Sequence, residues 1–314
     1  MKNYVRVSML MIEFLMLILP VFSRQENLAF TDRGKNKSTI KPGEMKRILD
    51  GAADYCEKIE KSAFHFFCYE KVSETRTPLS SSGNISPLID QSFSSSAGRR
   101  DLAAIRGKAY TQNYKYVNTY RLIKIKDTIK EVRKPVSSKK NQKVEGETVL
   151  TPQTFISIRA VFAPGTLLGR FVQYRYHYRF MRFDKRNDRQ VVVIEVVPKK
   201  PGETTGIYGN VWIDMEDFSV VKIQADPRSV VGYQQLEENA KKLKAKLYLS
   251  LEAEFDEIHQ GLRFPTKVSI LEKYRGGPII IRHRGRKEWV RTRIQFKYND
   301  YQFFGVETRV MPQE

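Results

Sequence analysis

The chain has few of the residues from which catalytic and metal sites are usually built. It contains two cysteines and four histidines among 314 residues. The histidines (His65, His177, His259 and His283) lie in four separate segments without metal-ligand spacing. A nucleophile elbow, a P-loop and a dinucleotide-binding glycine pattern are all missing from the sequence. We therefore expect no enzyme activity, no metal and no other cofactor, although dispersed catalytic groups would leave no such motif.

Long hydrophobic runs are also scarce, and the one that occurs spans residues 7–22. Basic residues precede it and small residues end it, so residues 1–23 are predicted to be a signal peptide. Glu13 inside the run and Arg24 after it leave an uncleaved membrane anchor as the alternative. No cysteine follows the run, which excludes a bacterial lipid-modified N-terminus. We expect an exported protein that is soluble in the periplasm.

Acidic residues are few in comparison with basic ones, at 35 against 55, which gives a formal net charge of +20. Export argues against a nucleic-acid partner and favours anionic membrane surfaces, and solubility alone is the competing explanation for scattered charges. The residues expected to contact an anionic surface are Arg175, Arg179, Arg282, Arg284, Arg286, Arg291 and Arg293.

Cys56 and Cys68 are the only cysteines, and an exported chain meets an oxidising compartment. Cys56 lies near the end of a predicted helix and Cys68 in the strand that follows. A chain that doubles back between them would bring the two together, so we predict a disulfide. Two buried free thiols are the alternative.

The chain organisation after the signal peptide is predicted as a flexible leader, residues 24–42, and one domain, residues 43–314. A Ser-rich insertion at about residues 78–98 interrupts the domain. Apolar residues at spacings of three and four predict amphipathic helices at 44–61 and 233–245.

A third helix is expected to contain Phe155, Ile158 and Phe162 and to end at Pro164-Gly165. The remainder predicts roughly ten strands, mostly joined as antiparallel neighbours. Expected hairpins turn at Lys126-Asp127, at the segments "DKRND" and "MED", and at Asn299-Asp300.

Alternation is the strongest feature of these strands. Within "FVQYRYHYRF", residues 171–180, the apolar and aromatic side chains from Val172 to Phe180 occupy one parity, and Gln173, Arg175, His177 and Arg179 occupy the other. The run "VVVIEVV" is apolar on both parities and predicts a strand covered on both faces. One long sheet with an apolar face and few helices is expected to curl into a barrel or half-barrel. The residues predicted to line a hydrophobic cavity inside it are Val172, Tyr174, Tyr176, Tyr178, Phe180, Val211, Ile213, Leu249, Leu251, Phe255, Val268, Ile270, Ile294 and Phe296.

Several segments resemble a known family. Residues 209–227 ("GNVWIDMEDFSVVKIQADP"), 261–274 ("GLRFPTKVSILEKY") and 298–310 ("YNDYQFFGVETRV") look like the outer-membrane lipoprotein-sorting proteins of the LolA/LolB-like superfamily. Residues 54–72 are similar to the start of an exported branch of it, and the resemblance covers roughly residues 44–312. It implies an unclosed antiparallel half-barrel, mainly β, with helices covering its concave face and a cavity for acyl chains. No functional residue can be carried over from the family by motif.

The resulting hypothesis is an exported carrier or chaperone that holds the acyl chains of a lipid or lipoprotein. One alternative is a lipid sensor of the same fold, which would require a membrane-protein partner. Another is a cationic surface-binding protein whose hollow is filled by its own side chains. A monomer is expected in each case.

Overall fold

The computed structural model describes residues 40–77, 111–126, 128–136, 160–200, 206–284 and 287–304, without the side chains of 282–284. All of these residues belong to one compact unit, Ser38–Glu314. The predicted signal peptide, nearly all of the predicted leader and the Ser-rich insertion lie outside the described residues.

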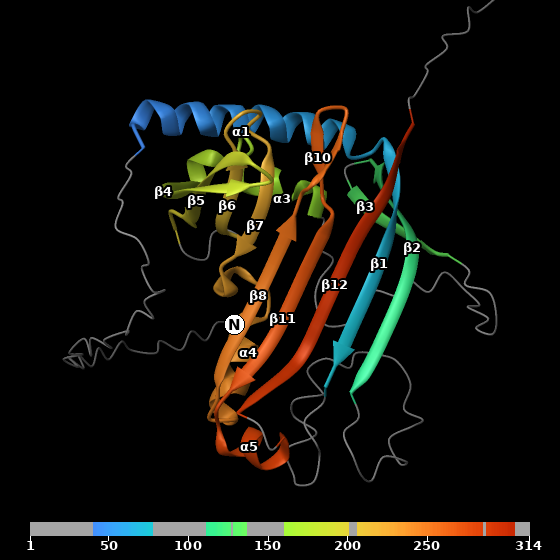
Figure 1. The fold of residues 1–314 in the computed structure, drawn as a ribbon, viewed down its shortest axis with the longest axis vertical. Helices are drawn as coiled ribbons and strands as arrows, with labels where there is room; N and C mark the ends of the chain where they lie inside the picture. Colours follow the sequence, from blue (N-terminus) through green and yellow to red (C-terminus); the bar gives the residue numbers. More distant parts are fainter. Residues whose placement is uncertain are drawn as a thin grey trace, which may run out of the picture. The chain divides into compact units, whose positions relative to one another are not determined.

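Antiparallel strands form most of the described structure. Ten of them make one sheet in the order β3-β2-β1-β12-β11-β8-β7-β6-β5-β4, and its edge strands β3 and β4 are not paired with each other, so the sheet is open (Figure 1). β9 and β10 form a separate hairpin. The mainly β, unclosed antiparallel fold predicted from the sequence is confirmed. The strands are β1 (Phe66–Arg76), β2 (Gln112–Ile125), β3 (Thr128–Pro135), β4 (Tyr176–Arg186), β5 (Arg189–Pro198), β6 (Gly209–Asp214), β7 (Val220–Ala225), β8 (Lys246–Glu254), β9 (Glu257–His259), β10 (Leu262–Phe264), β11 (Lys267–Arg275) and β12 (Glu288–Phe303).

The predicted hairpins β2–β3, β4–β5 and β6–β7 are all present as antiparallel pairs. The predicted hairpin at Asn299-Asp300 is wrong, because β12 continues through both residues to Phe303. Asp300 has a φ of 56°, and the pairing with β1 shifts register beside Asn299. The turn signal in the sequence therefore marks an irregularity within one strand, since Asp tolerates the left-handed region better than most residues.

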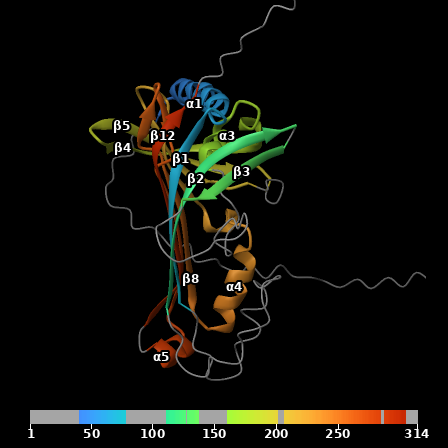
Figure 2. The same ribbon diagram turned by 90° about the vertical axis from the view of Figure 1, so that its right-hand side faces the viewer.

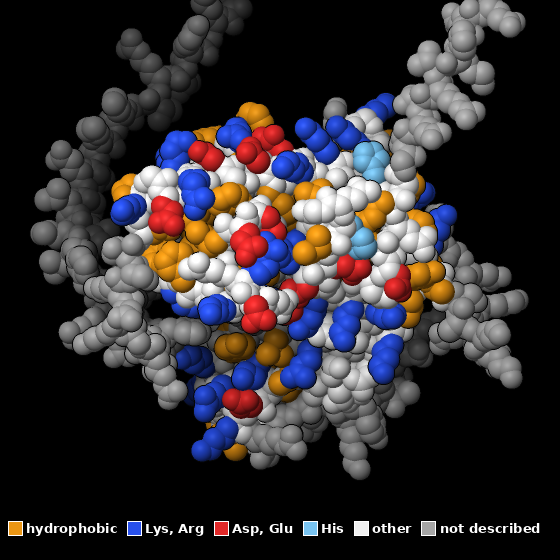
Figure 3. Space-filling view, turned by 45° about the horizontal axis from the view of Figure 1, so that its top comes forward, with side chains coloured by type: hydrophobic (Ala, Val, Ile, Leu, Met, Phe, Trp, Pro, Cys, Tyr) orange, Lys and Arg blue, Asp and Glu red, His pale blue; other side chains and the backbone are white. Residues whose placement is uncertain are grey.

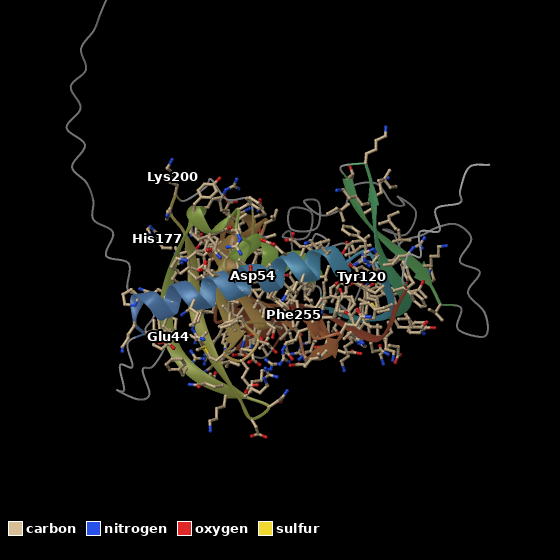
Figure 4. The ribbon with its side chains drawn as sticks, turned by 90° about the horizontal axis from the view of Figure 1, so that it is seen from above. Glu44, Asp54, Tyr120, His177, Lys200 and Phe255 are labelled. Atoms are coloured by element: carbon tan, nitrogen blue, oxygen red, sulfur yellow. The ribbon has the colours of Figure 1, made fainter. Side chains whose placement is uncertain are left out.

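Helix α1 (Pro42–Ser62) extends across one end of the sheet, with Glu44 near its start and Tyr120 of β2 beyond its other end (Figure 4). It begins with a proline in its first turn, where a missing N–H is harmless. Ile48, Ala52 and Ile59 lie on its buried stripe. This confirms the first predicted helix.

Helix α4 (Tyr233–Lys242) confirms the second predicted helix, with Leu236 and Ala240 buried. It lies on one side of the long strands, which we call the inner face of the sheet; the other side is the outer face (Figure 2). The other helical segments are α3 (Ala163–Leu168), α5 (Pro278–Arg284) and the 3-10 turns η1 (Ala160–Phe162), η2 (Gln173–Arg175) and η3 (Pro227–Ser229). The proposed end of a helix at Pro164-Gly165 is wrong, since both residues lie in the first turn of α3, a position that proline favours.

Strand β5 is buried on both faces, as its two-sided apolar run predicts. Val192 and Ile194 belong to the main core on the inner face. Val191 and Val193 pack with Trp212 and Val221 in a separate cluster. Arg182 and Lys222 lie over the Trp212 ring, 5.8 Å and 5.3 Å from its centroid, so long basic side chains cover this outer cluster.

The turn between β6 and β7 packs against α1 through an unusual pair of residues. Phe218 has a φ of 57°, and its ring lies where a β-carbon on Gly51 would be. Such a β-carbon would be 2.5 Å from both Cγ and Cδ2 of Phe218. The Arg47 guanidinium carbon also lies over the Phe218 ring, 5.3 Å from its centroid. The absence of a side chain at Gly51 thus allows α1 to approach the β6–β7 turn.

Candidate functional site: a cavity on the inner face

A cavity of about 1220 Å³ opens on the inner face of the sheet. Its walls come from the end of α1, from β2 and β3, from η1 and α3, and from β7, β8 and the segments at 206–207 and 229–231. The apolar side chains that line it are Phe64, Ile129, Phe162, Ala163, Leu167, Val172, Ile207, Ile223, Val230, Val231, Leu251 and Ala253.

The floor of the cavity is built by strand alternation. Ile223 of β7 and Ala253 of β8 are paired across the sheet and point inward. Their chain neighbours Lys222 and Glu252 point outward and form an ion pair of 2.7 Å between Nζ and Oε2. The same alternation therefore supplies an apolar floor on one face and a solvated ion pair on the other.

One wall of the cavity contains a buried cluster of charged groups. The Arg133 guanidinium donates from Nε and Nη2 to the two Glu70 carboxylate oxygens at 2.7 and 3.0 Å, and from Nη1 to Glu131 at 3.1 Å. The Tyr120 hydroxyl donates to Glu131 at 2.8 Å, and its ring lies 5.0 Å from the guanidinium carbon. Burial favours the neutral form of Arg133, but hydrogen bonding to Glu70 and the charges of Glu70 and Glu131 raise its pKa overall. These groups satisfy one another and give the wall a fixed, polar end.

Another lining residue, Glu60, carries a carboxyl group with a different environment. Glu60 of α1 lines the cavity and packs against Gly165 of α3, where a β-carbon would collide with its carboxylate. Partial burial, followed by the nearby charge of Glu57, raises the pKa of Glu60. Gly165 is thus the residue that lets α3 close over the end of α1.

The predicted cavity residues divide between the cavity and the core. Val172 and Leu251 line the cavity. The others are buried or half-buried in the core next to it, apart from Tyr174. Much of the predicted wall is therefore filled by side-chain packing, and the open space lies further toward β2 and β3. The core residues are Tyr176, Tyr178, Phe180, Val211, Ile213, Leu249, Phe255, Val268, Ile270, Ile294 and Phe296.

The prediction for Tyr174 is wrong, because the strand begins later than the alternation does. Residues 173–175 form η2, and β4 starts at Tyr176. Tyr174 is 66% exposed and its hydroxyl accepts a hydrogen bond from Arg175. A second break follows at the bulge between Phe180 and Arg182. Tyr178 packs against the core, and its hydroxyl donates to the Leu167 carbonyl at 2.7 Å.

The predicted disulfide is absent, and Cys56 and Cys68 are both buried free thiols. Both side chains belong to the main core, but their polar neighbours differ. Cys68 interacts with the Tyr301 hydroxyl on β12, whereas the charges felt by Cys56 are those of Glu57 and Glu60 on its own helix. Desolvation raises the pKa of both thiols well above its usual range.

The predicted basic contact residues have three different outcomes. Arg175, Arg179 and Arg293 are exposed, and Arg179 pairs with Glu195. Arg291 does not fit the prediction, because it is half-buried and donates to the fully buried Glu272 at 3.0 Å. A bulge between Glu272 and Lys273 breaks the alternation at this point. The side chains of Arg282 and Arg284, and all of Arg286, lie outside the described residues.

The Glu70–Arg133–Glu131 cluster was not predicted from the sequence. A weak signal was present in "TIKEVRK", where Ile129, Glu131 and Arg133 share one parity, so that charges continue an apolar row. Glu70, the main partner, is 63 positions away in the sequence. Only the pairing of β1 with β2 and of β2 with β3 brings the three charges together.

Two absences concern the described part of the chain. No group of three or more His, Cys, Asp or Glu side chains there could hold a metal ion. None of its helices has the length and apolar character needed to cross a membrane.

No protein-family model and no curated protein matches this chain. Solved structures do match. An outer membrane lipoprotein-sorting protein domain from Vibrio parahaemolyticus is 9% identical with a TM-score of 0.36, over 84% of this chain and 95% of that one. A LolA superfamily protein from Nitrosomonas europaea is 13% identical with a TM-score of 0.31, over 82% and 94% of the two chains. A DUF1329 family protein from Desulfovibrio piger is 12% identical with a TM-score of 0.32, over 83% and 95%.

The second of these structures is of a protein from the LolA superfamily, which the sequence resembles. At this identity and these TM-scores, the likeness assigns no ligand and no site residue to this chain.

Proposed function

We propose that the protein is an exported, periplasmic carrier that holds acyl chains of a lipid or lipoprotein in the inner-face cavity. The observation that supports this is the cavity itself, about 1220 Å³ in volume and lined mainly by aliphatic and aromatic side chains. Ligand pockets in proteins are of this order, roughly 300–1,000 Å³, and are predominantly apolar with a few placed polar groups.

An acyl chain matches the chemistry of this lining. The floor, formed by Ile223, Leu251 and Ala253, offers no hydrogen-bonding side chain. Each methylene that leaves water for such surroundings contributes about 0.8 kcal/mol. Glu60, Lys124 and Lys130 also line the cavity, but the buried pair Glu131 and Arg133 already satisfies itself and Glu70, so this end favours a ligand that needs few new hydrogen bonds.

The test is the uptake of a fluorescent fatty acid by the whole mature protein. Ile207→Asp and Ile129→Asp place a charge in the cavity at half-buried positions and should reduce the affinity at least tenfold. The matched control is Val197→Asp, which adds the same charge at an exposed apolar residue of β5 and should leave uptake unchanged. Circular dichroism and thermal unfolding would establish that each variant is folded.

The proposal fails if the parent protein takes up no acyl probe, or if both folded cavity variants bind it as the parent does. Native mass spectrometry of the protein purified from its own envelope gives an independent measurement. A co-purifying lipid mass that disappears in Ile207→Asp would support the proposal.

A further inference from the structure

A row of like charges lies across the outer face of the sheet. Lys71 of β1 is directly opposite Lys297 of β12, and Lys297 is directly opposite Lys267 of β11. Directly opposed residues on neighbouring strands have their β-carbons only about 4.5–5.5 Å apart, and like charges at that spacing are destabilising. An arrangement that opposes folding calls for a compensating role.

The local ion pairs do not neutralise this row. Lys267 is bound by Glu254 at 3.3 Å. Within the described part of the chain, no carboxylate lies within 4 Å of the charged groups of Lys71, Lys297, Arg293 or Lys115. These four are exposed, and we refer to them as the basic face: Lys71, Lys115, Arg293 and Lys297.

The basic face is on the side of the sheet opposite to the cavity. On β1, Glu70 and Val72 are buried on the inner face, so Lys71 between them points outward. α4 lies on the inner side of these strands (Figure 2). In the space-filling view, Lys and Arg side chains gather on the lower part of the described surface with few acidic side chains between them (Figure 3). Among the described residues, nothing packs over this face.

We propose that the basic face docks the protein onto an anionic lipid bilayer. Its cations are spread over β12, β1 and β2, so they form a two-dimensional array, which a plane of anionic headgroups can neutralise together. Exposed apolar groups lie on the same face, since Val117 is opposite Lys71 and 40% exposed, and Tyr248 is 50% exposed. Tyrosine is enriched at membrane–water interfaces.

The expected strength follows from the number of cations. Each Lys or Arg at an anionic surface changes the partition coefficient about fivefold, equivalent to about 1 kcal/mol. Lys71→Gln, Arg293→Gln and Lys297→Gln in one variant should therefore weaken binding on the order of 100-fold. The attraction is screened over about 10 Å at 0.1 M salt, so binding of the parent should fall steeply as salt is added.

The test is co-sedimentation of the mature protein with phosphatidylcholine vesicles that contain or lack phosphatidylglycerol. The matched control is Lys46→Gln, Lys58→Gln and Lys61→Gln, which removes the same charge from exposed positions of α1. We expect the control to retain most of the binding. The basic-face variant should unfold at the same temperature as the parent or higher, because it removes a repulsion.

Three outcomes would overturn the proposal. Equal binding to vesicles without phosphatidylglycerol would remove the electrostatic argument. Equal losses in the two triple variants would show that net charge matters and the basic face does not. Tighter binding of a double-stranded oligonucleotide than of anionic vesicles, lost in the basic-face variant, would assign this face to a nucleic acid. The measurement uses no acyl probe, so its result is separate from that of the cavity test.

Discussion

The replacement of Arg133 by methionine tests how the charged wall of the cavity is held together. The side chains of Arg133, Glu70 and Glu131 are 5%, 0% and 6% exposed. Without the guanidinium, two carboxylates would face each other in a region from which water is largely excluded. Removing one partner of a buried ion pair typically costs about 3–5 kcal/mol, so we expect a loss in this range.

Two companion variants sharpen this prediction. Replacing Glu70 by leucine together with Arg133→Met removes both members of the main pair, and the double variant should be more stable than Arg133→Met alone. Arg170→Met removes a cation that pairs with Asp54 and Glu57 at about half exposure, and it should cost less than about 1 kcal/mol.

Equilibrium unfolding in urea, followed by circular dichroism, gives these free energies when the slope m is unchanged. The reasoning is refuted if Arg133→Met costs no more than Arg170→Met. It is also refuted if the losses from the two single changes simply add in the double variant, because a paired unit must show coupling.

Two further predictions concern α1. Gly51→Ala would place a β-carbon 2.5 Å from the Phe218 ring, and we expect it to lower the free energy of unfolding in urea by about 1–3 kcal/mol. The control is Gly43→Ala, whose β-carbon meets no atom within 4 Å and which should have a smaller effect. An equal effect at both positions would contradict the packing argument. Because burial raises the pKa of Cys56 and Cys68, neither thiol should react with a thiol reagent in the native protein, even at mildly alkaline pH, and both should react after unfolding without reductant. Mass spectrometry that finds an unlabelled, oxidised pair after unfolding would restore the disulfide.

Strands and helices were predictable because their periodicities are local. The stripe of α1 and the alternation of β8 follow from spacings of 3.6 and 2 residues, and both are found as predicted. Strand starts and bulges were less predictable, because an alternating pattern continues unchanged through them. Tyr174 keeps the parity of Tyr176 in the sequence, yet η2 turns it to solvent.

The candidate site was predictable in kind but not in position. One-sided apolar strands indicated a hollow, and Leu251 does line it. Its open part, however, lies beside β3, α3 and the segments before β6 and after β7, and only the first of these is a strand. The buried partners Glu70 and Arg133 come from strands far apart in the sequence, so no local pattern connects them.

Alternation also explains how one sheet can serve two separate purposes. In β1, Val72 contributes to the buried inner face while Lys71 belongs to the basic face, so adjacent residues act on opposite sides of the sheet. A change of one side chain on the outer face leaves the cavity lining in place. Likewise, a change of Ile207, which lines the cavity from outside the sheet strands, leaves the basic face in place. A bilayer bound to the outer face would therefore leave the cavity on the inner face open to water. Movement of an acyl chain between bilayer and cavity would then require the protein to reorient on the membrane or to leave the membrane. The reversible, salt-sensitive attraction of a few cations suits this surface better than a deeply inserted apolar anchor does.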